Sequence, residues 1–297
     1  MRHKALQRIL SGVIFTLMPG ICSLAAEPRP LTTDGRAKRD VTVLRGGEEI
    51  LFVAQHSAIL QRLERLRLAD RAITVVHPES NKGEFEPSVS PDGKYLAFIQ
   101  GRGNLSLALV IEEVAAKKQF DLPPAGGFAG YRAPAIAPNN GRVLFSFAEG
   151  GSQHLYSVNL QGQDRKQVTN LPGIVSHPAY SPDGRLLACA ATWDGNYDVY
   201  LLSVDGSNPR RLTDSPQQDL RPRWSPDGQR LAFTSNRDGN YEIYVMRADG
   251  TELTRVTRNP ERDDYAAWMP DGKELVFVGE RDGKQDLYLV PAPGFEE

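Results

Sequence analysis

The sequence predicts an all-β fold built from six copies of one four-stranded antiparallel sheet. Three observations predict it. A Ser-Pro-Asp-Gly turn recurs at nearly constant spacing, each copy carries short β-prone segments separated by turn residues, and a segment near the N-terminus matches the strand that the last copy lacks. Together they indicate a ring of repeated sheets that is closed by the N-terminal segment of the chain.

The turn Ser225–Gly228 shows the local chemistry of the repeat. Proline presets φ for the second turn position, and glycine accepts the positive φ that closes the turn. Trp224 precedes the turn and Leu231–Thr234 follows it, and two short β-prone runs joined in this way predict a hairpin. Two further glycine-containing turns follow, at 236–240 and 249–250. The unit therefore holds four predicted strands.

The unit recurs along the chain. Its proline lies at 91, 138, 182, 226 and 270, so successive copies are 47, 44, 44 and 44 residues apart. The second predicted strands of these copies are Leu96–Ile99, Val143–Phe147, Leu186–Ala190, Leu231–Thr234 and Leu275–Val278. A period of about 40 to 50 residues with four strands per unit is typical of a β-propeller. One such sheet cannot bury both faces alone, so adjacent blades must stack.

The residue before each turn is apolar or aromatic, and we expect it to fill the space between neighbouring blades. These residues are Val89, Ile136, Tyr180, Trp224 and Trp268. A sixth, less regular copy precedes the others, because Gly46–Phe52 matches Asp92–Phe98 with an offset of 46 residues. Its first strand is then Val41–Leu44. Its third segment, Gln61–Leu68, fits either a strand or a helical turn, and we favour a strand.

The ring has a candidate closing strand. The last copy ends after its third strand, at Pro291–Pro293, whereas Pro30–Thr33 resembles Arg211–Asp214, part of a fourth strand in another copy. We therefore expect residues 30–33 to complete the last blade, so that no sheet edge stays open. The repeats cover nearly all of residues 30–294, which predicts a single propeller domain over residues 26–297.

The first 25 residues have the features of a signal peptide. Basic residues precede the apolar run Ile9–Leu17, and small residues follow as far as Ala25 and Ala26, where we expect cleavage. The alternatives are a retained membrane anchor and a lipoprotein modified at Cys22. The apolar run is shorter than the roughly 20 residues of a membrane span, and the residues just before Cys22 lack the usual small residue, so we expect no transmembrane span in the mature chain. This leader predicts a periplasmic or secreted protein. Only Cys189 remains after cleavage, so we expect no internal disulfide.

Composition excludes some classes of partner. The formal charge of the 297 residues is −2 and no basic run is present, so we expect no nucleic-acid binding. The Asp-Gly turns lack the spaced acidic ligands of a calcium loop, and no histidine has a second ligand at metal-binding spacing. We therefore predict no metal and no cofactor, and we expect a monomer.

With these repeats, and with strands such as Glu242–Met246, the sequence resembles the TolB-like, WD40-like β-propeller family. The resemblance implies a six-bladed propeller over almost the whole mature chain. It also implies a role in the cell envelope, since the family's namesake belongs to the periplasmic Tol–Pal system and binds a peptidoglycan-associated lipoprotein at the propeller mouth. That protein carries an α/β domain before its propeller. Here the predicted leader and first blade nearly touch, so we expect that domain to be absent.

When the six copies are aligned, one position carries a different residue in every copy. Just before the first predicted strand, successive copies read Asp40, Glu86, Ala133, His177, Arg221 and Tyr265. We expect these residues to begin the innermost strands and to surround one mouth of the central channel, where propeller loops bind ligands. Arginines suit a carboxylate or peptide backbone, and a tyrosine supplies amphipathic contact area. We therefore predict a partner-binding rim of Asp40, Glu86, His177, Arg221, Arg223 and Tyr265.

Three interpretations of this rim stay open. The first is a non-catalytic surface that recognises a protein or peptide partner in the envelope, and we favour it. The second is that these positions are exposed polar loops that vary without a role. The third is a lyase or hydrolase acting on a carbohydrate or peptide, with Asp40, Glu86 and His177 as acid–base groups. A buried cluster with strongly shifted ionisation at His177 and Glu86 would favour the enzyme, and a solvated rim would favour binding.

Overall fold

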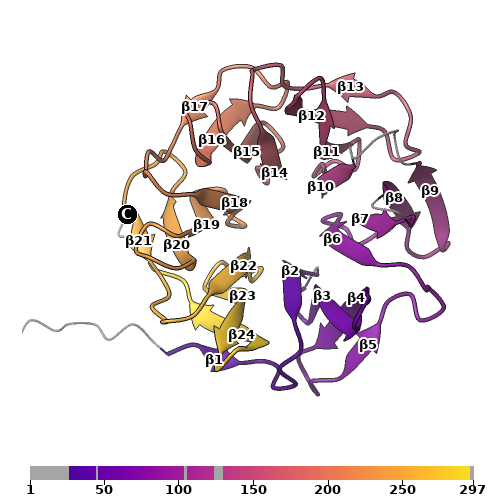
Figure 1. Ribbon diagram of the computed structural model, residues 1–297, viewed down its shortest axis with the longest axis vertical. Helices are drawn as coiled ribbons and strands as arrows, with labels where there is room; N and C mark the ends of the chain where they lie inside the picture. The colour runs from indigo at the N-terminus through magenta and orange to yellow at the C-terminus, as the bar shows by residue number, and fades with distance from the viewer. Residues whose placement is uncertain (1–26, 45, 104–105, 124–129, 295–297) are drawn as a thin grey trace, which may run out of the picture.

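The computed structural model describes residues 27–44, 46–103, 106–123 and 130–294. These residues form six four-stranded antiparallel sheets arranged as blades around a central axis (Figure 1). The predicted six-bladed propeller is therefore confirmed. The described ranges contain no helix that could cross a membrane. The predicted signal peptide, residues 1–25, lies outside the described residues.

Each blade runs from an inner strand at the axis to an outer strand at the rim (Figure 1). The inner strands are β2 (Lys38–Val43), β6 (Glu84–Val89), β10 (Tyr131–Ile136), β14 (Val175–Tyr180), β18 (Asp219–Trp224) and β22 (Asp263–Trp268). The second strands are β3 (Glu49–Ser57), β7 (Tyr95–Gly101), β11 (Val143–Glu149), β15 (Leu186–Ala191), β19 (Arg230–Ser235) and β23 (Glu274–Arg281).

The third strand of each blade is largely buried, whereas the outermost strand is short and mostly exposed or half-buried. The third strands are β4 (Leu60–Arg67), β8 (Leu107–Glu113), β12 (Ser152–Val158), β16 (Asp198–Ser203), β20 (Glu242–Arg247) and β24 (Lys284–Pro291). The outer strands are β5 (Ile73–Val75), β9 (Lys118–Leu122), β13 (Lys166–Gln167), β17 (Arg210–Arg211), β21 (Thr254–Arg255) and β1 (Arg29–Pro30). The ambiguous segment of the first copy is thus a strand, β4, as expected.

The Ser-Pro-Asp-Gly turns join the inner strand to the second strand. In the fifth blade, Gly228 has φ 73° and its N–H donates to the Ser225 carbonyl at 2.9 Å. The Ser225 hydroxyl accepts a second bond, from the Arg230 N–H at 2.9 Å, so one buried serine ties both ends of the turn. The same serine bond occurs at Ser90 and Ser181. This explains why the turn repeats so closely.

Neighbouring blades are joined by the side chain before each turn, as predicted. Trp224 packs against an apolar cluster that includes Ala188 and Leu201 of the preceding blade, and its indole N–H donates to the Ala179 carbonyl at 3.2 Å. Trp268 repeats this bond one blade later, to the Arg223 carbonyl at 3.0 Å. The other three residues of the set lie in the apolar clusters between their blades; they are Val89, Ile136 and Tyr180.

The sixth blade is completed by the N-terminal strand. β1 pairs antiparallel with β24, with Arg29 opposite Leu289, and the Leu31 N–H then donates to the Leu287 carbonyl at 2.7 Å. The strand proper is one residue ahead of the predicted segment 30–33, but the pairing continues through Leu31 and Thr32. The closure of the ring by residues near the N-terminus is therefore confirmed.

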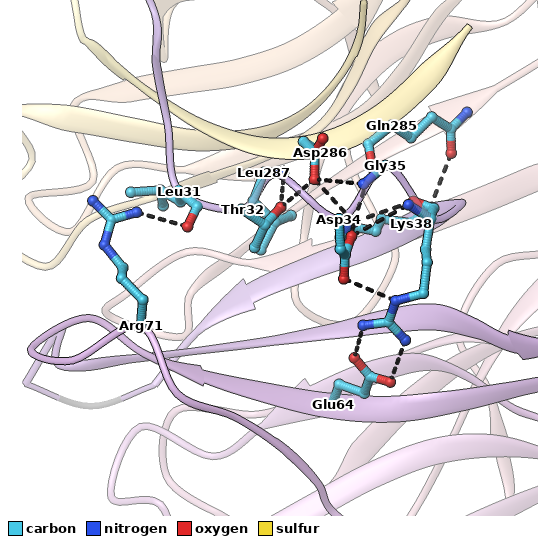
Figure 2. Close-up of polar contacts among 11 residues, drawn as sticks. Leu31, Thr32, Asp34, Gly35, Lys38, Glu64, Arg71, Gln285, Asp286 and Leu287 are labelled. Carbon is cyan, nitrogen blue, oxygen red and sulfur yellow. Dashed lines mark hydrogen bonds and ion pairs between the residues drawn. The ribbon is translucent and has the colours of Figure 1, made fainter.

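An ionic cluster reinforces this closure (Figure 2). Arg36 donates to both carboxylate oxygens of Glu64 on β4, each at 2.7 Å. The buried ammonium of Lys38 contacts Asp34 and donates to Asp286 on β24 at 3.2 Å. The cluster thus connects the N-terminal segment to the first and sixth blades at once.

Candidate functional site

A β-bulge interrupts the inner strand of every blade. In the first blade, Arg39 pairs with Val53 and the next pair is Thr42 with Leu51. The inner strand therefore advances by three residues while the second strand advances by two. The shift recurs in the other five blades. Each bulge contains one non-glycine residue with positive φ, between 47° and 58°; these are Asp40, Glu86, Ala133, His177, Arg221 and Tyr265. We call these six residues the channel ring.

The channel ring corrects the predicted strand boundaries. These residues do not precede the first strands; each is the third residue of its inner strand, and β2 begins at Lys38 instead of Val41. The left-handed conformation costs about 1–2 kcal/mol for a residue with a Cβ, and bulges redirect side chains. In four copies a proline follows, which disfavours the right-handed helical conformation at the residue before it. All six ring residues and Arg223 line one cavity inside the channel.

The two acidic side chains of the channel ring, Asp40 and Glu86, both have hydrogen-bond partners within the protein. Asp40 accepts from the Arg39 guanidinium at 2.7 Å and from the Glu86 backbone N–H at 3.2 Å. Glu86 accepts from Arg132 at 2.6 Å and from the Ala133 N–H, also at 2.6 Å. Burial, with the negative charge of Glu86 added, raises the pKa of Asp40 against the opposing effect of Arg39. Each carboxylate therefore joins its own bulge to the bulge of the next blade.

The basic side is built on Tyr265. The Arg221 guanidinium lies 4.4 Å from the centroid of the Tyr265 ring and 3.3 Å from the Asp264 carboxylate. Burial raises the pKa of Tyr265, so its hydroxyl stays protonated at neutral pH. A cation over an aromatic face contributes about 0.5–2 kcal/mol, more as water is removed. This pair is therefore held in place by the fold.

Arg223 and His177 have fewer partners. Arg223 donates to the Pro222 carbonyl at 3.1 Å, and none of the described carboxylates lies within ion-pair distance of its guanidinium. Burial lowers the pKa of Arg223. The Nδ1 atom of His177 is buried without a hydrogen-bond partner among the described residues. Burial, followed by the charges of Arg221 and Arg223, holds the pKa of His177 well below its usual value, so the imidazole is neutral.

The channel opens into a wider hollow at the turn side. The cavity at the channel ring has a volume of about 30 Å³. The hollow beyond it, which we call the funnel, has a volume of about 570 Å³. Its walls include five turn prolines and three aromatic residues, which are Pro91, Pro138, Pro182, Pro226, Pro270, Tyr180, Trp224 and Trp268. Sequence reasoning treated these residues only as turn and packing residues, and so missed the surface that they form together.

The sequence analysis also did not predict a second buried polar cluster, which is centred on His77. The imidazole of His77 lies between two buried carboxylates, with Nδ1 at 2.9 Å from Glu84 and Nε2 at 3.0 Å from Glu112. The three residues are separated along the chain, and the histidine lies in the loop that connects β5 to β6. Among the described residues, no group of three or more His, Cys, Asp or Glu side chains is arranged to hold a metal ion.

Comparison with known proteins agrees with this architecture. Residues 159–287 match the family model of the TolB β-propeller domain. A TolB homologue of Chlorobium chlorochromatii is 34% identical over 105 residues, which is 34% of this chain and 22% of that protein. The Tol-Pal system protein TolB of Xanthomonas campestris pv. campestris is 32% identical over 95 residues, 32% of this chain and 21% of that protein. The matched stretch is thus about a fifth of the length of these curated relatives.

Solved structures show the same fold at low sequence identity. TolB from Acinetobacter baumannii has a TM-score of 0.68 at 19% identity, covering 83% of this chain and 64% of that chain. An oligogalacturonate lyase in complex with manganese has a TM-score of 0.62 at 17% identity, covering 92% of this chain and 94% of that chain. The repeat and the ring of six sheets establish that the chain is a six-bladed β-propeller, and residues 159–287 of it are similar to the TolB β-propeller domain.

Proposed function

We propose that the protein is an exported, non-catalytic binding protein of the cell envelope, which recognises a protein or peptide partner through the channel ring and the funnel. The names of its relatives, TolB and Tol-Pal system protein, support an envelope role. The predicted leader supports export to the periplasm or beyond. The observation that carries the proposal is a rigid ring that gathers Arg221, Arg223 and Tyr265 around one cavity, beside an apolar funnel.

The enzyme interpretation has one observation in its favour. His177 is half-buried with a pKa well below its usual value, and Asp40 has a raised pKa, which is the kind of environment expected for acid–base chemistry. The oligogalacturonate lyase shows that an enzyme can have this fold. However, the cavity between these groups holds about 30 Å³, whereas substrate pockets are usually about 300–1,000 Å³. A sugar or peptide bond has no room between them, so we favour recognition.

Chemical crosslinking followed by affinity capture from envelope extract tests the proposal. Wild type is compared with Arg221→Ala/Tyr265→Ala and with a control, Ile73→Ala/Lys166→Ala, on the outer strands β5 and β13. We expect wild type and the control to capture the same partner and the channel variant to lose it. Circular dichroism melts show whether each variant is folded. Identical partner lists for all three proteins would contradict recognition through the channel.

A further inference from the structure

We propose that the funnel and the channel beneath it bind the C-terminal end of a peptide, with Arg223 binding the terminal carboxylate. The inference rests on the proposed function and specifies the chemistry of the partner. Arg223 lines both the funnel and the cavity at the channel ring. Among the described residues, it is also the one charged side chain in the funnel lining. The site is therefore a funnel with many proline and aromatic residues in its walls and, in the described lining, a single cation at its floor.

Arg223 has unused capacity to bind an anion. A guanidinium carries five N–H donors, and the described contacts of Arg223 occupy one of its nitrogens, with the Pro222 carbonyl. A half-buried charge without a counter-ion is partly desolvated, so a carboxylate that reaches Arg223 gains a charge-assisted and bidentate pair. No carboxylate of the described chain supplies this pair within 4 Å.

The acids of the channel ring are occupied elsewhere. Asp40 is hydrogen-bonded to Arg39, and Glu86 to Arg132 and to the Ala133 N–H. Their negative charges offset the positive charge of Arg223 only from a distance. The Nδ1 atom of His177, which is buried and unpartnered among the described residues, borders the same cavity. Within the described part of the chain, the channel thus holds one unpartnered imidazole nitrogen and one guanidinium without an ion pair.

The funnel walls favour an apolar peptide segment. Proline side chains project from the inner strands and from the turns, and the residues that line the funnel in this way include Pro87, Pro134 and Pro178 on the inner strands. Tyr180, Trp224 and Trp268 add aromatic surface. Because these residues are held by the backbone and by indole hydrogen bonds, little conformational entropy is lost when a ligand packs on them.

The narrowing of the channel favours a chain end over an internal acidic residue. A volume of about 30 Å³ accommodates about two water molecules, so a polypeptide cannot continue past Arg223 to the other face. A C-terminus can approach along the axis, with its carboxylate at Arg223 and the preceding residues in the funnel. An internal glutamate would require the chain to turn back within the funnel. We therefore assign the site to a C-terminal carboxylate.

Short synthetic peptides test the assignment directly. The probes are acetyl-Ala-Pro-Phe with a free carboxylate, the same peptide as its C-terminal amide, and acetyl-Ala-Glu-Phe-amide, which carries its charge on an internal side chain. Binding is measured by isothermal titration calorimetry and by tryptophan fluorescence, since two of the three tryptophans line the funnel. We expect the free acid to bind at least about tenfold more tightly than either amide, as one charged hydrogen-bonded pair predicts.

The variants are Arg223→Gln, Arg223→Lys and the control Lys166→Gln on an outer strand. We expect Arg223→Gln to lose the preference for the acid, Arg223→Lys to keep part of it, and the control to bind like wild type. Three results would each overturn the assignment. The first is that the free acid shows no saturable binding, and the second is that the terminal amide or the internal-glutamate peptide binds within twofold of the acid. The third is that Arg223→Gln keeps the preference for the acid. The comparison of probes on wild type holds even if a variant does not fold.

The outcome can be separated from that of the proposed function. If capture of an envelope partner depends on Arg221 and Tyr265 but the peptides show no preference for a free carboxylate, recognition stands and the C-terminal assignment fails. If the peptides bind as expected but the capture lists are identical, the carboxylate site stands and the partner-binding role is wrong.

Discussion

The hydroxyl of Thr32 donates a 2.7 Å hydrogen bond to Asp286, which lies 254 residues later in the chain (Figure 2). The same threonine oxygen accepts from the Leu287 N–H at 3.0 Å. Three other blades have a threonine in this position on the outer segment, bonded to a third-strand N–H in the same way; these are Thr169, Thr213 and Thr257. Thr32 is therefore the closing residue of the sixth blade.

Replacing Thr32 by Val should destabilise the ring. The substitution keeps the shape but leaves the buried Leu287 N–H and Asp286 without this partner, which costs about 1–3 kcal/mol of unfolding free energy. Urea unfolding followed by fluorescence measures the change. Thr33→Val is the matched control, because Thr33 is exposed and should change stability by less than about 0.5 kcal/mol. Equal effects at the two positions would show that the closing bond contributes nothing.

Trp268 should contribute more to stability than Trp224. Trp268 is 7% exposed and packs between the fifth and sixth blades, whereas Trp224 is partly exposed at the funnel. We expect Trp268→Ala to cost about 3–5 kcal/mol and Trp224→Ala clearly less. Trp268→Phe keeps an aromatic ring but removes the N–H bond to Arg223, so its cost should lie between that of alanine and zero. Denaturant midpoints compare the variants, and a reversed order would contradict the packing described here.

The stability of the propeller should decline at alkaline pH because of His77. Burial alone would lower the pKa of His77, but its bonds to Glu112 and Glu84 together raise it to about 9, above the usual 6.5. A group whose pKa is raised by folding stabilises fully below its unfolded pKa, and this contribution is lost as pH rises from about 6.5 through about 9. Unfolding free energies measured between pH 6 and pH 9.5 should fall for wild type.

The matched comparison is His77→Gln, which removes the titration. Its stability should be lower at pH 6 and should change less between pH 6 and pH 9.5 than that of wild type. A parallel decline in both proteins would assign the pH dependence to other groups.

The positive φ of Ala133 should lower the unfolding free energy of the protein, because alanine is strained in the left-handed conformation. This residue has φ 47° and no polar side chain, so glycine should relieve the left-handed conformation and stabilise the protein by about 0.5–1 kcal/mol. Ala135→Gly, two residues further along β10, is the control. There the backbone has no positive φ and the methyl group is buried, so glycine should destabilise. Destabilisation at both positions would mean that the bulge carries no strain.

The sequence by itself determined the blade number, the strand order within each blade and the closing segment. A turn that repeats every 44 residues has the same local chemistry in each copy, and the missing last strand has a counterpart at Leu31 and Thr32. These features depend on short-range turn and strand preferences, which a single sequence displays. The one position that differs in every copy was also visible when the copies were aligned, although the structure places it third in the inner strand and not just before that strand.

Only the tertiary structure decided what lies at the channel. The bulges at His177 and Arg221 follow from strand register, and a non-glycine residue with positive φ leaves little trace in composition. That no described carboxylate pairs with Arg223 depends on where the acids of the ring point, and the His77 cluster joins residues from a loop and two strands. Such relationships arise between distant segments once the ring has closed, because closure fixes which side chains share a buried space.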